Sequence, residues 1–349
     1  PDVFIKQDVF IKQNMAIQSL WKLAFFLLLI LSLQPGAAAD NHNLLLSQSE
    51  INGAGSEVVT PHIRTQLFSE YSAISPGQRF WVALRQQIIP GWHTYWRNPG
   101  DSGEPTAMDW ELPPGWQASA IYWPFPSRLP LGPLVNFGYS NEVWLLTELQ
   151  APANLSIGQS LQLTANGFWL VCEEVCIPEE GVLYLPLQVT DSPEPSAFQQ
   201  VIELAVDNLP KPFAGRVGYA LTGGDLQLVF NNPRSDHPAK VEFFPHFSDV
   251  IEHAAPQKLS VEKDQLLLQI PSQFAAQPDR LDGVLVFTPA ANSAMPTQGY
   301  QLSTQQLQAI SVANANGTGL SLGMVLLMAM AGGLMLNLMP CVFPVLSIK

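Results

Sequence analysis

Short apolar runs, separated by glycine, proline and asparagine, constrain the fold of this chain more than any other feature of its sequence. Four of these runs are partly alternating and rich in valine, tryptophan, phenylalanine and leucine: residues 79–88, 142–150, 160–171 and 181–189. Alternation of apolar and polar residues predicts half-buried β-strands. The regular spacing of the runs, without a repeated helical pattern, predicts an antiparallel β-sandwich over residues 40–190.

A second series of strand-like runs follows a break at residues 190–196 and one short predicted helix at residues 197–209. Its runs are residues 216–230, 240–246, 258–270 and 282–290. We therefore expect a mainly β fold with two immunoglobulin-like β-sandwich domains, at residues 40–190 and 211–305, joined by a linker with a short helix at 191–210. The 30 prolines and 24 glycines are typical of a loop-rich β protein.

The N-terminal region has the pattern of an exported protein. Residues 1–14 contain the hexad DVFIKQ twice and are interpreted as upstream read-through. Residues 15–39 resemble a signal peptide, with Lys22 before an apolar run at 23–33 and with Ala37 and Ala39 before the expected cleavage point. An uncleaved anchor is the alternative, but eleven apolar residues span only about half of a ~30 Å hydrocarbon core.

The C-terminal region carries a predicted membrane segment. The near-continuous apolar run at residues 320–339 has about the ~20 residues needed to span a bilayer. We expect residues 320–349 to contain the first transmembrane segment of a truncated membrane domain, after a linker at 306–319. With residues 40–319 exported, Lys349 lies on the inner side, as the positive-inside rule requires.

The net charge of the predicted exported part excludes some classes of binding partner. Residues 1–39 contain three Lys and two Asp of the 16 basic and 29 acidic residues, so the exported part has a net charge of −14. This charge argues against nucleic acid or an anionic membrane surface as a partner.

Cys172 and Cys176 are the only cysteines predicted to be exported, and export places them in an oxidising compartment. A structural disulfide is one interpretation. However, a bridge that closes so short a loop removes little chain entropy and stabilises the fold weakly. The spacing requires a turn at residues 173–175 or one turn of helix. No histidine or further cysteine lies nearby in the sequence, which disfavours a closed zinc site, while a two-cysteine copper(I) site remains open.

Acidic residues surround the cysteine pair in the sequence: Glu173, Glu174, Glu179 and Glu180. Negative charge disfavours a thiolate. We therefore expect a thiol that reacts slowly alone and faster when a partner docks.

Cys341 lies between Pro340 and Pro344, one helical turn after Asn337. Each proline removes a backbone donor, and the freed carbonyls are tolerated in a bilayer only within protein or beside a wet cavity. We expect a functional cysteine buried among further helices; an ordinary membrane cysteine after a proline kink is the alternative.

Several stretches resemble a known family. GGLMLNLMPCVFPVLSIK (332–349) is similar to the opening of the membrane domain of the DsbD family of thiol:disulfide interchange proteins. GWHTYWRNPGDSGEPT (91–106), RLPLGPLVNFGYSNEVWL (128–145) and WLVCEEVCIPE (169–179) resemble the periplasmic portion of the ScsB-like branch, linked to suppression of copper sensitivity. The close spacing of the two exported cysteines favours that branch.

The resemblance implies an electron relay through protein disulfides, with no other cofactor. Cytoplasmic thioredoxin would supply electrons through Cys341 and a second membrane cysteine to a C-terminal thioredoxin-like domain. From there electrons would reach Cys172 and Cys176, with Cys176 forming the mixed disulfide and Cys172 resolving it. The chain would then be part of an inner-membrane protein-disulfide reductase that acts on periplasmic thioredoxin-like disulfide proteins.

A reduced pair in an oxidising space needs shielding from stray oxidants. Candidates are rings in two aromatic-rich segments, predicted as loops: Trp92, Tyr95, Trp96, Phe137 and Tyr139. Ordinary core packing explains these rings equally well. His93 and Arg97 are interpreted as polar neighbours of the cysteines or, more simply, as loop residues.

A different class of function also fits the sequence. The chain could be a membrane-anchored β-sandwich binding module, for copper or a protein partner, with a structural disulfide at Cys172 and Cys176. The two classes differ in whether the cysteine pair cycles between disulfide and dithiol.

Overall fold

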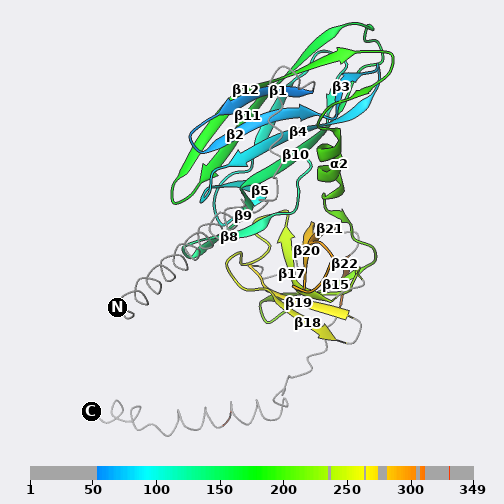
Figure 1. The fold of residues 1–349 in the computed structure, drawn as a ribbon. Helices are drawn as coiled ribbons and strands as arrows, with labels where there is room; N and C mark the ends of the chain where they lie inside the picture. Colours follow the sequence, from blue (N-terminus) through cyan, green and yellow to red (C-terminus); the bar gives the residue numbers. More distant parts are fainter. Residues whose placement is uncertain are drawn as a thin grey trace, which may run out of the picture. The chain divides into compact units, whose positions relative to one another are not determined.

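Four β-sheets make up most of the computed structural model, which describes residues 53–234, 237–262, 265–273, 281–303, 307–310 and 330 (Figure 1). The predicted mainly β fold is confirmed. The interpreted read-through, the signal peptide and Cys341 lie outside the described residues, as does the membrane segment apart from Met330. Within the described ranges, none of the helices has the length and apolar character that crossing a bilayer requires.

The N-terminal sheet pair contains strands β1 to β13. Its first sheet has the order β1 (Ala54–Val59), β2 (Ile63–Ser69), β4 (Arg79–Ile88), β10 (Glu142–Gln150) and β7 (Gln117–Ala118). Its second sheet has the order β13 (Glu194–Pro195), β3 (Tyr71–Ile74), β12 (Cys176–Val189), β11 (Ser160–Cys172), β5 (His93–Gly100), β9 (Leu134–Ser140) and β8 (Ser127–Leu131), with β6 (Ala107–Glu111) also paired to β11.

The C-terminal sheet pair contains strands β14 to β22. One sheet has the order β14 (Lys211–Pro212), β21 (Gln298–Leu302), β20 (Gly283–Pro289) and β17 (Pro238–Pro245). The other has the order β18 (Lys258–Glu262), β19 (Gln265–Pro271), β16 (Asp225–Asn231), β15 (Val217–Thr222) and β22 (Leu307–Ala309). Strand β22 lies in the segment predicted as a linker, because these residues pair with β15.

Helix α2 (Gln199–Asp207) occupies the predicted helical segment between the two sheet pairs in the sequence. Its buried Ile202 packs against Phe68, Ala83 and Leu146, which lie on the first sheet. Pro210 follows shortly after the helix and cannot continue it, because proline lacks the backbone donor and clashes with the preceding turn.

The hairpin of β11 and β12 shows how sequence alternation sets the fold. Leu183, Leu185 and Leu187 are buried, whereas Val182 and Tyr184, which alternate with the leucines, are exposed. Fully burying one such leucine contributes about 1.5–3 kcal/mol, so a register slip of one residue would expose all three. The strands are paired without a break from Ser160 opposite Gln188 to Cys172 opposite Cys176. Packing of the leucines thus fixes where the cysteines lie.

Three strand pairs differ from the predicted antiparallel arrangement. Strand β3 joins β12 in parallel, β14 joins β21 in parallel and β22 joins β15 in parallel. A parallel neighbour needs a crossover connection instead of a tight hairpin. These pairings therefore join segments far apart in the sequence, which local alternation does not reveal.

Candidate functional site

Cys172 and Cys176 lie directly opposite each other at the end of the β11–β12 hairpin and form a disulfide. Residues 173–175 connect the strands, and the backbone N of Glu173 donates to the carbonyl of Val175 at 3.3 Å. The predicted turn is confirmed and the helical alternative is wrong. The disulfide closes a hairpin whose register is already fixed by packing.

The two sulfur-bearing residues differ in their access to solvent. Cys172 is fully buried, whereas Cys176 is exposed. The neighbouring turn residue Val175 is also exposed, at 68%. An incoming thiolate therefore reaches Cys176 from solvent, while Cys172 lies behind it.

Strand β5 supplies two side chains beside the disulfide. The hydroxyl of buried Tyr95 lies 3.3 Å from Sγ of Cys176. Burial raises the pKa of Tyr95 to about 12, so the phenol stays protonated at neutral pH. His93 is paired in register with Cys172, and its ring meets the Tyr95 ring edge-on at 5.1 Å. Burial lowers the pKa of His93, which keeps this ring neutral at pH 7.

The loop after β5 supports Tyr95. Gly103 has a φ of +97°, and a Cβ at this position would lie 2.2 Å from the Tyr95 ring. The side chain of Ser102 lies near the Tyr95 hydroxyl and partly offsets the rise that burial causes in the pKa of Tyr95. The backbone N and Oγ of Ser102 also donate to Oδ1 of Asn136, at 3.2 and 3.0 Å. The loop therefore fixes the ring whose hydroxyl touches the disulfide.

The same loop contacts the C-terminal sheet pair. Oδ2 of Asp101 accepts from the backbone N of Val135 at 2.7 Å, and Oδ1 lies 2.9 Å from Nδ1 of the buried His253. Asn98 donates from Nδ2 to the carbonyl of Pro245 at 2.8 Å. Contacts with the second sheet pair therefore hold residues on both sides of the bend that ends β5.

Of the five predicted shielding rings, Tyr95 contacts Cys176 through its hydroxyl. Trp92 stacks on His62 with ring centroids 4.0 Å apart. Trp96 and Phe137 meet Phe244 of strand β17 edge-on, at 6.3 and 4.9 Å.

The predicted loops are wrong for four of the rings. Tyr95 and Trp96 lie on β5, while Phe137 and Tyr139 lie on β9. Tyr139 donates from its hydroxyl to the carbonyl of Pro124 at 2.7 Å. Each ring fills a buried strand position, which accounts for the aromatic-rich sequence. The shielding role of these rings stays a prediction.

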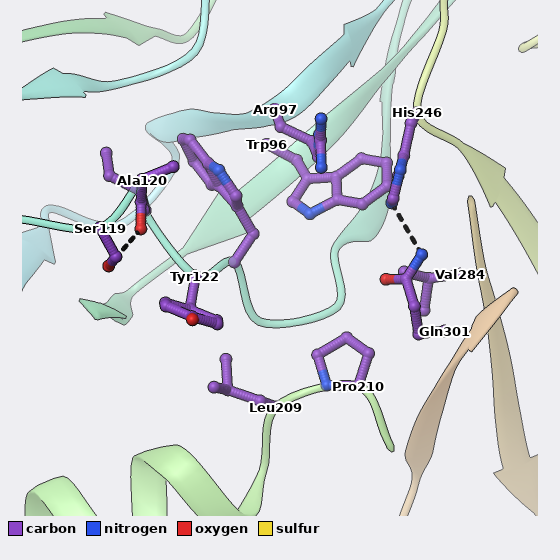
Figure 2. Close-up of a pocket in the computed structure, with 12 residues that line it drawn as sticks. Trp96, Arg97, Ser119, Ala120, Tyr122, Leu209, Pro210, His246, Val284 and Gln301 are labelled. Carbon is purple, nitrogen blue, oxygen red and sulfur yellow. Dashed lines mark hydrogen bonds between the residues drawn. The ribbon is translucent and has the colours of Figure 1, made fainter. Parts of the chain in front are cut away.

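A pocket of about 420 Å³ lies beside Trp96. Figure 2 shows Arg97 beside Trp96, His246 joined to Gln301, and Leu209 and Pro210 at the bottom of the view. Its lining residues are Trp96, Arg97, Ser119, Ala120, Ile121, Tyr122, Trp123, Leu209, Pro210, His246, Val284 and Gln301. Arg97 is one of the residues that line this pocket, and neither cysteine is among them. Arg97, interpreted from the sequence as a neighbour of the cysteines or as a loop residue, lies on strand β5 and lines this pocket.

The four glutamates near the cysteines in the sequence have different surroundings. Glu173 and Glu174 are exposed in the turn, and the carboxylate of Glu173 lies over Gly91. Glu179 instead accepts hydrogen bonds from Thr60 at 2.7 Å and Trp169 at 3.2 Å. Glu173 and Glu174 therefore stand in the turn that connects the two cysteines, with their side chains exposed.

The interpretation of His93 as a polar neighbour of the cysteines is confirmed for Cys172, and the loop alternative is wrong, because His93 begins strand β5. His93 is brought there by long-range pairing of β5 with β11. The signal that could have pointed to this neighbourhood is the stretch PGDSG, whose glycines and aspartate form the loop under Tyr95. Among the described residues, no group of three or more His, Cys, Asp or Glu side chains is placed to hold a metal ion.

The site is therefore a disulfide at the end of a hairpin of two interior strands, with one exposed and one buried cysteine. The family model described as "Thiol:disulfide interchange protein DsbD, N-terminal" matches residues 64–188, which contain both cysteines. This match covers about a third of the chain and makes these residues similar to the N-terminal domain of that family. The resemblance to a DsbD-type protein with an ScsB-like exported part is confirmed.

A solved structure supports the same fold. The N-terminal periplasmic domain of ScsB from Proteus mirabilis aligns with a TM-score of 0.52 and 19% identity, covering 72% of this chain and 98% of that chain. The GAE domain of yeast GGA1 aligns over 38% of this chain and 98% of that chain, at 12% identity and a TM-score of 0.24, too low to carry an argument. The comparison with curated proteins gave no match.

Proposed function

We propose that Cys172 and Cys176 form a redox-active disulfide that exchanges with disulfides of other proteins. The observation that carries the proposal is the exposure of Cys176 beside the fully buried Cys172. Exchange proceeds by thiolate attack on one sulfur of a disulfide, which requires one accessible sulfur and one that resolves the adduct. The match of residues 64–188 to the DsbD N-terminal family supports this assignment.

The direction of electron flow is part of the proposal. The pair receives electrons by way of Cys341 and a thioredoxin-like domain, and passes them to thioredoxin-like disulfide proteins. Cytoplasmic thioredoxin is the ultimate donor, and the chain acts as a protein-disulfide reductase. The sequence resemblance of residues 332–349 to the DsbD membrane domain supports this route.

The exported residues act in the periplasm, and the apolar run at 320–339 anchors them to the inner membrane. Support comes from the signal-like N-terminal region and from the ScsB structure, which is titled as a periplasmic domain. A role in copper tolerance rests on the ScsB-like resemblance alone.

A trapping experiment tests the exchange function. The chain with Cys172→Ser and Cys341→Ser keeps Cys176 as its one thiol, because the sequence has three cysteines. Mixed with an oxidised thioredoxin-like protein, this variant should accumulate a mixed disulfide, visible as a covalent adduct by mass. The matched variant with Cys176→Ser and Cys341→Ser keeps only the buried Cys172 and should give little adduct.

A negative result would favour the binding module. In that case the Cys172→Ser chain forms no adduct, and removal of both cysteines only lowers the free energy of unfolding.

A further inference from the structure

His93 stands beside the buried cysteine of the pair. It lies directly opposite Cys172 across the β5–β11 pairing, so the two side chains are on the same face of the sheet. Such opposed residues have Cβ atoms about 4.5–5.5 Å apart. The edge-on contact of His93 with Tyr95, whose hydroxyl touches Cys176, places the imidazole on the disulfide side of β5.

One nitrogen of the imidazole is buried and makes no hydrogen bond within the described part of the chain. Nε2 of His93 is inaccessible to solvent and has no hydrogen-bond partner among the described residues. A buried polar atom without a partner costs about 1–3 kcal/mol, and such atoms are rare in folded proteins. In the disulfide state, Cys172 has no thiol proton to donate. Reduction creates a buried S–H on the neighbouring strand, which is a donor for this nitrogen.

We propose that His93 is the general base for Cys172 during resolution of the mixed disulfide, an inference that rests on the proposed exchange function. Cys176 is then bonded to the substrate sulfur, and Cys172 is a buried thiol. The thiol proton passes to Nε2 of His93, while the sulfur of Cys172 forms a bond to Sγ of Cys176. The bond from Cys176 to the substrate sulfur breaks, and its electron pair leaves on the substrate thiolate.

The balance of this step is complete. The two cysteines lose two electrons and become a disulfide, and the substrate disulfide gains them. The proton held by His93 then passes to the released substrate thiolate or to solvent. Burial of Cys172 disfavours its thiolate, so an adjacent base is needed to accept the thiol proton as the sulfur attacks. Burial also lowers the pKa of His93 and keeps the ring available as an acceptor at pH 7.

The groups that face the imidazole do not compete for this role. Tyr95 on the same strand stays protonated because its pKa is raised to about 12. On β9 the paired residue is Ser140, which does not titrate in this range. The turn carboxylate of Glu173 lies over Gly91.

A two-step chromogenic reaction separates attack from resolution. The reduced chain with Cys341→Ser is mixed with 5,5′-dithiobis(2-nitrobenzoate) in a stopped-flow instrument. Attack by Cys176 releases one coloured thiolate, and resolution by Cys172 releases a second. We expect His93→Phe to slow the second release about 100-fold or more, the usual range for a lost general base, and to change the first less than threefold. His62→Phe, a control that keeps the ring stack on Trp92, should change neither.

The pH dependence of the second release, measured in the chain that keeps His93, is a second test. It does not require that a His93 variant folds. With a histidine base, the second release slows as pH falls below the ring pKa and is level above about pH 6.5. Without a base, its rate rises about tenfold per pH unit up to the ordinary thiol pKa of about 8.5.

A tenfold rise per pH unit, or an unchanged second release in a folded His93→Phe chain, would overturn the role of His93 while leaving exchange intact. A chain that releases no coloured thiolate at all would overturn the exchange function as well.

Discussion

At Cys176, one phenol and two carboxylates set the reactivity of the exposed sulfur. The Tyr95 hydroxyl lies 3.3 Å from Sγ and stays protonated, so it can donate to a thiolate in the reduced state. Glu173 and Glu174 in the turn act in the opposite direction, because nearby negative charge disfavours the thiolate. The two influences can be separated by substitution.

Removal of the Tyr95 hydroxyl should slow the reaction of the Cys176 thiol with an alkylating agent. In the reduced Cys341→Ser chain, Tyr95→Phe should lower the rate of alkylation of Cys176 by iodoacetamide about three- to tenfold, since a hydrogen bond to a charged group is lost. The products are assigned by peptide mass. Tyr139→Phe is the matched control, because that hydroxyl donates to the Pro124 carbonyl. Equal rates for Tyr95→Phe and the parent chain would show that the phenol does not stabilise the thiolate.

Removal of the turn charges should have the opposite effect. The double substitution Glu173→Gln and Glu174→Gln should speed the same alkylation about two- to fivefold at low salt, the size usual for exposed charges. The difference should shrink at high salt, because exposed charges are screened. Glu180→Gln is a control on the same strand, away from the turn. A rate that does not change at any salt concentration would mean that the turn carboxylates do not act on Cys176.

At the residue scale, sequence reasoning found the cysteine pair, its turn and Tyr95 as a neighbour. It left His93 open between a polar neighbour of the cysteines and an ordinary loop residue, because nothing local connects it to Cys172. Their contact depends on the register between β5 and β11, which is fixed by packing elsewhere in the sheet.

At the scale of elements, the loop after β5 positions the ring that touches the disulfide. Gly103 has a left-handed φ and contacts Tyr95 so closely that a side chain would collide with the ring. Gly158 has a similar φ of +85°, but nothing lies within 4 Å of its Cβ position. Substitution at the two glycines therefore separates two costs in stability: the strain of a left-handed backbone, which both share, and the collision with the Tyr95 ring, which only Gly103 has.

Substitution at Gly103 should destabilise the fold and displace Tyr95. We expect Gly103→Ala to lower the free energy of unfolding by about 2–4 kcal/mol, from left-handed strain plus overpacking. Gly158→Ala should cost about 1–2 kcal/mol, from strain alone. Urea unfolding followed by tryptophan fluorescence measures both. Equal costs would show that the contact between Gly103 and the Tyr95 ring contributes nothing.

Strong local alternation made several elements predictable. The runs at 79–88 and 142–150 are confirmed as β4 and β10 with the predicted bounds. The predicted start of the strand at 181 is wrong, since β12 begins at Cys176 and includes Pro178 and two glutamates. Pairing with β11 overrides the poor strand propensity of those residues. Short edge strands such as β7 and β14 carry too few residues to show a period.

At the scale of the whole molecule, the two sheet pairs are coupled through the loop that supports the site. Asp101 joins the backbone of Val135 to the buried ring of His253, and Asp101 is the residue before Ser102. This coupling was not predictable from the sequence, because it joins positions more than 150 residues apart whose side chains are common surface types. It gives the C-terminal sheet pair a structural role next to the cysteines.

A double-mutant cycle measures that coupling. Asp101→Asn and His253→Gln should each lower the free energy of unfolding by about 1–3 kcal/mol, because each leaves a partly buried polar partner unsatisfied. The double variant should cost less than the sum of the two, since residues in contact are not additive. Additive costs would mean that the side chains of Asp101 and His253 do not interact in solution.

The reduction potential of the Cys172–Cys176 pair tests the exchange function most directly. The Cys341→Ser chain is equilibrated with mixtures of reduced and oxidised dithiothreitol, quenched with acid, alkylated and weighed by mass spectrometry. A pair that accepts electrons from a thioredoxin-type dithiol should have a midpoint at or above about −270 mV. A midpoint below about −300 mV, where structural disulfides lie, would contradict a cycling pair.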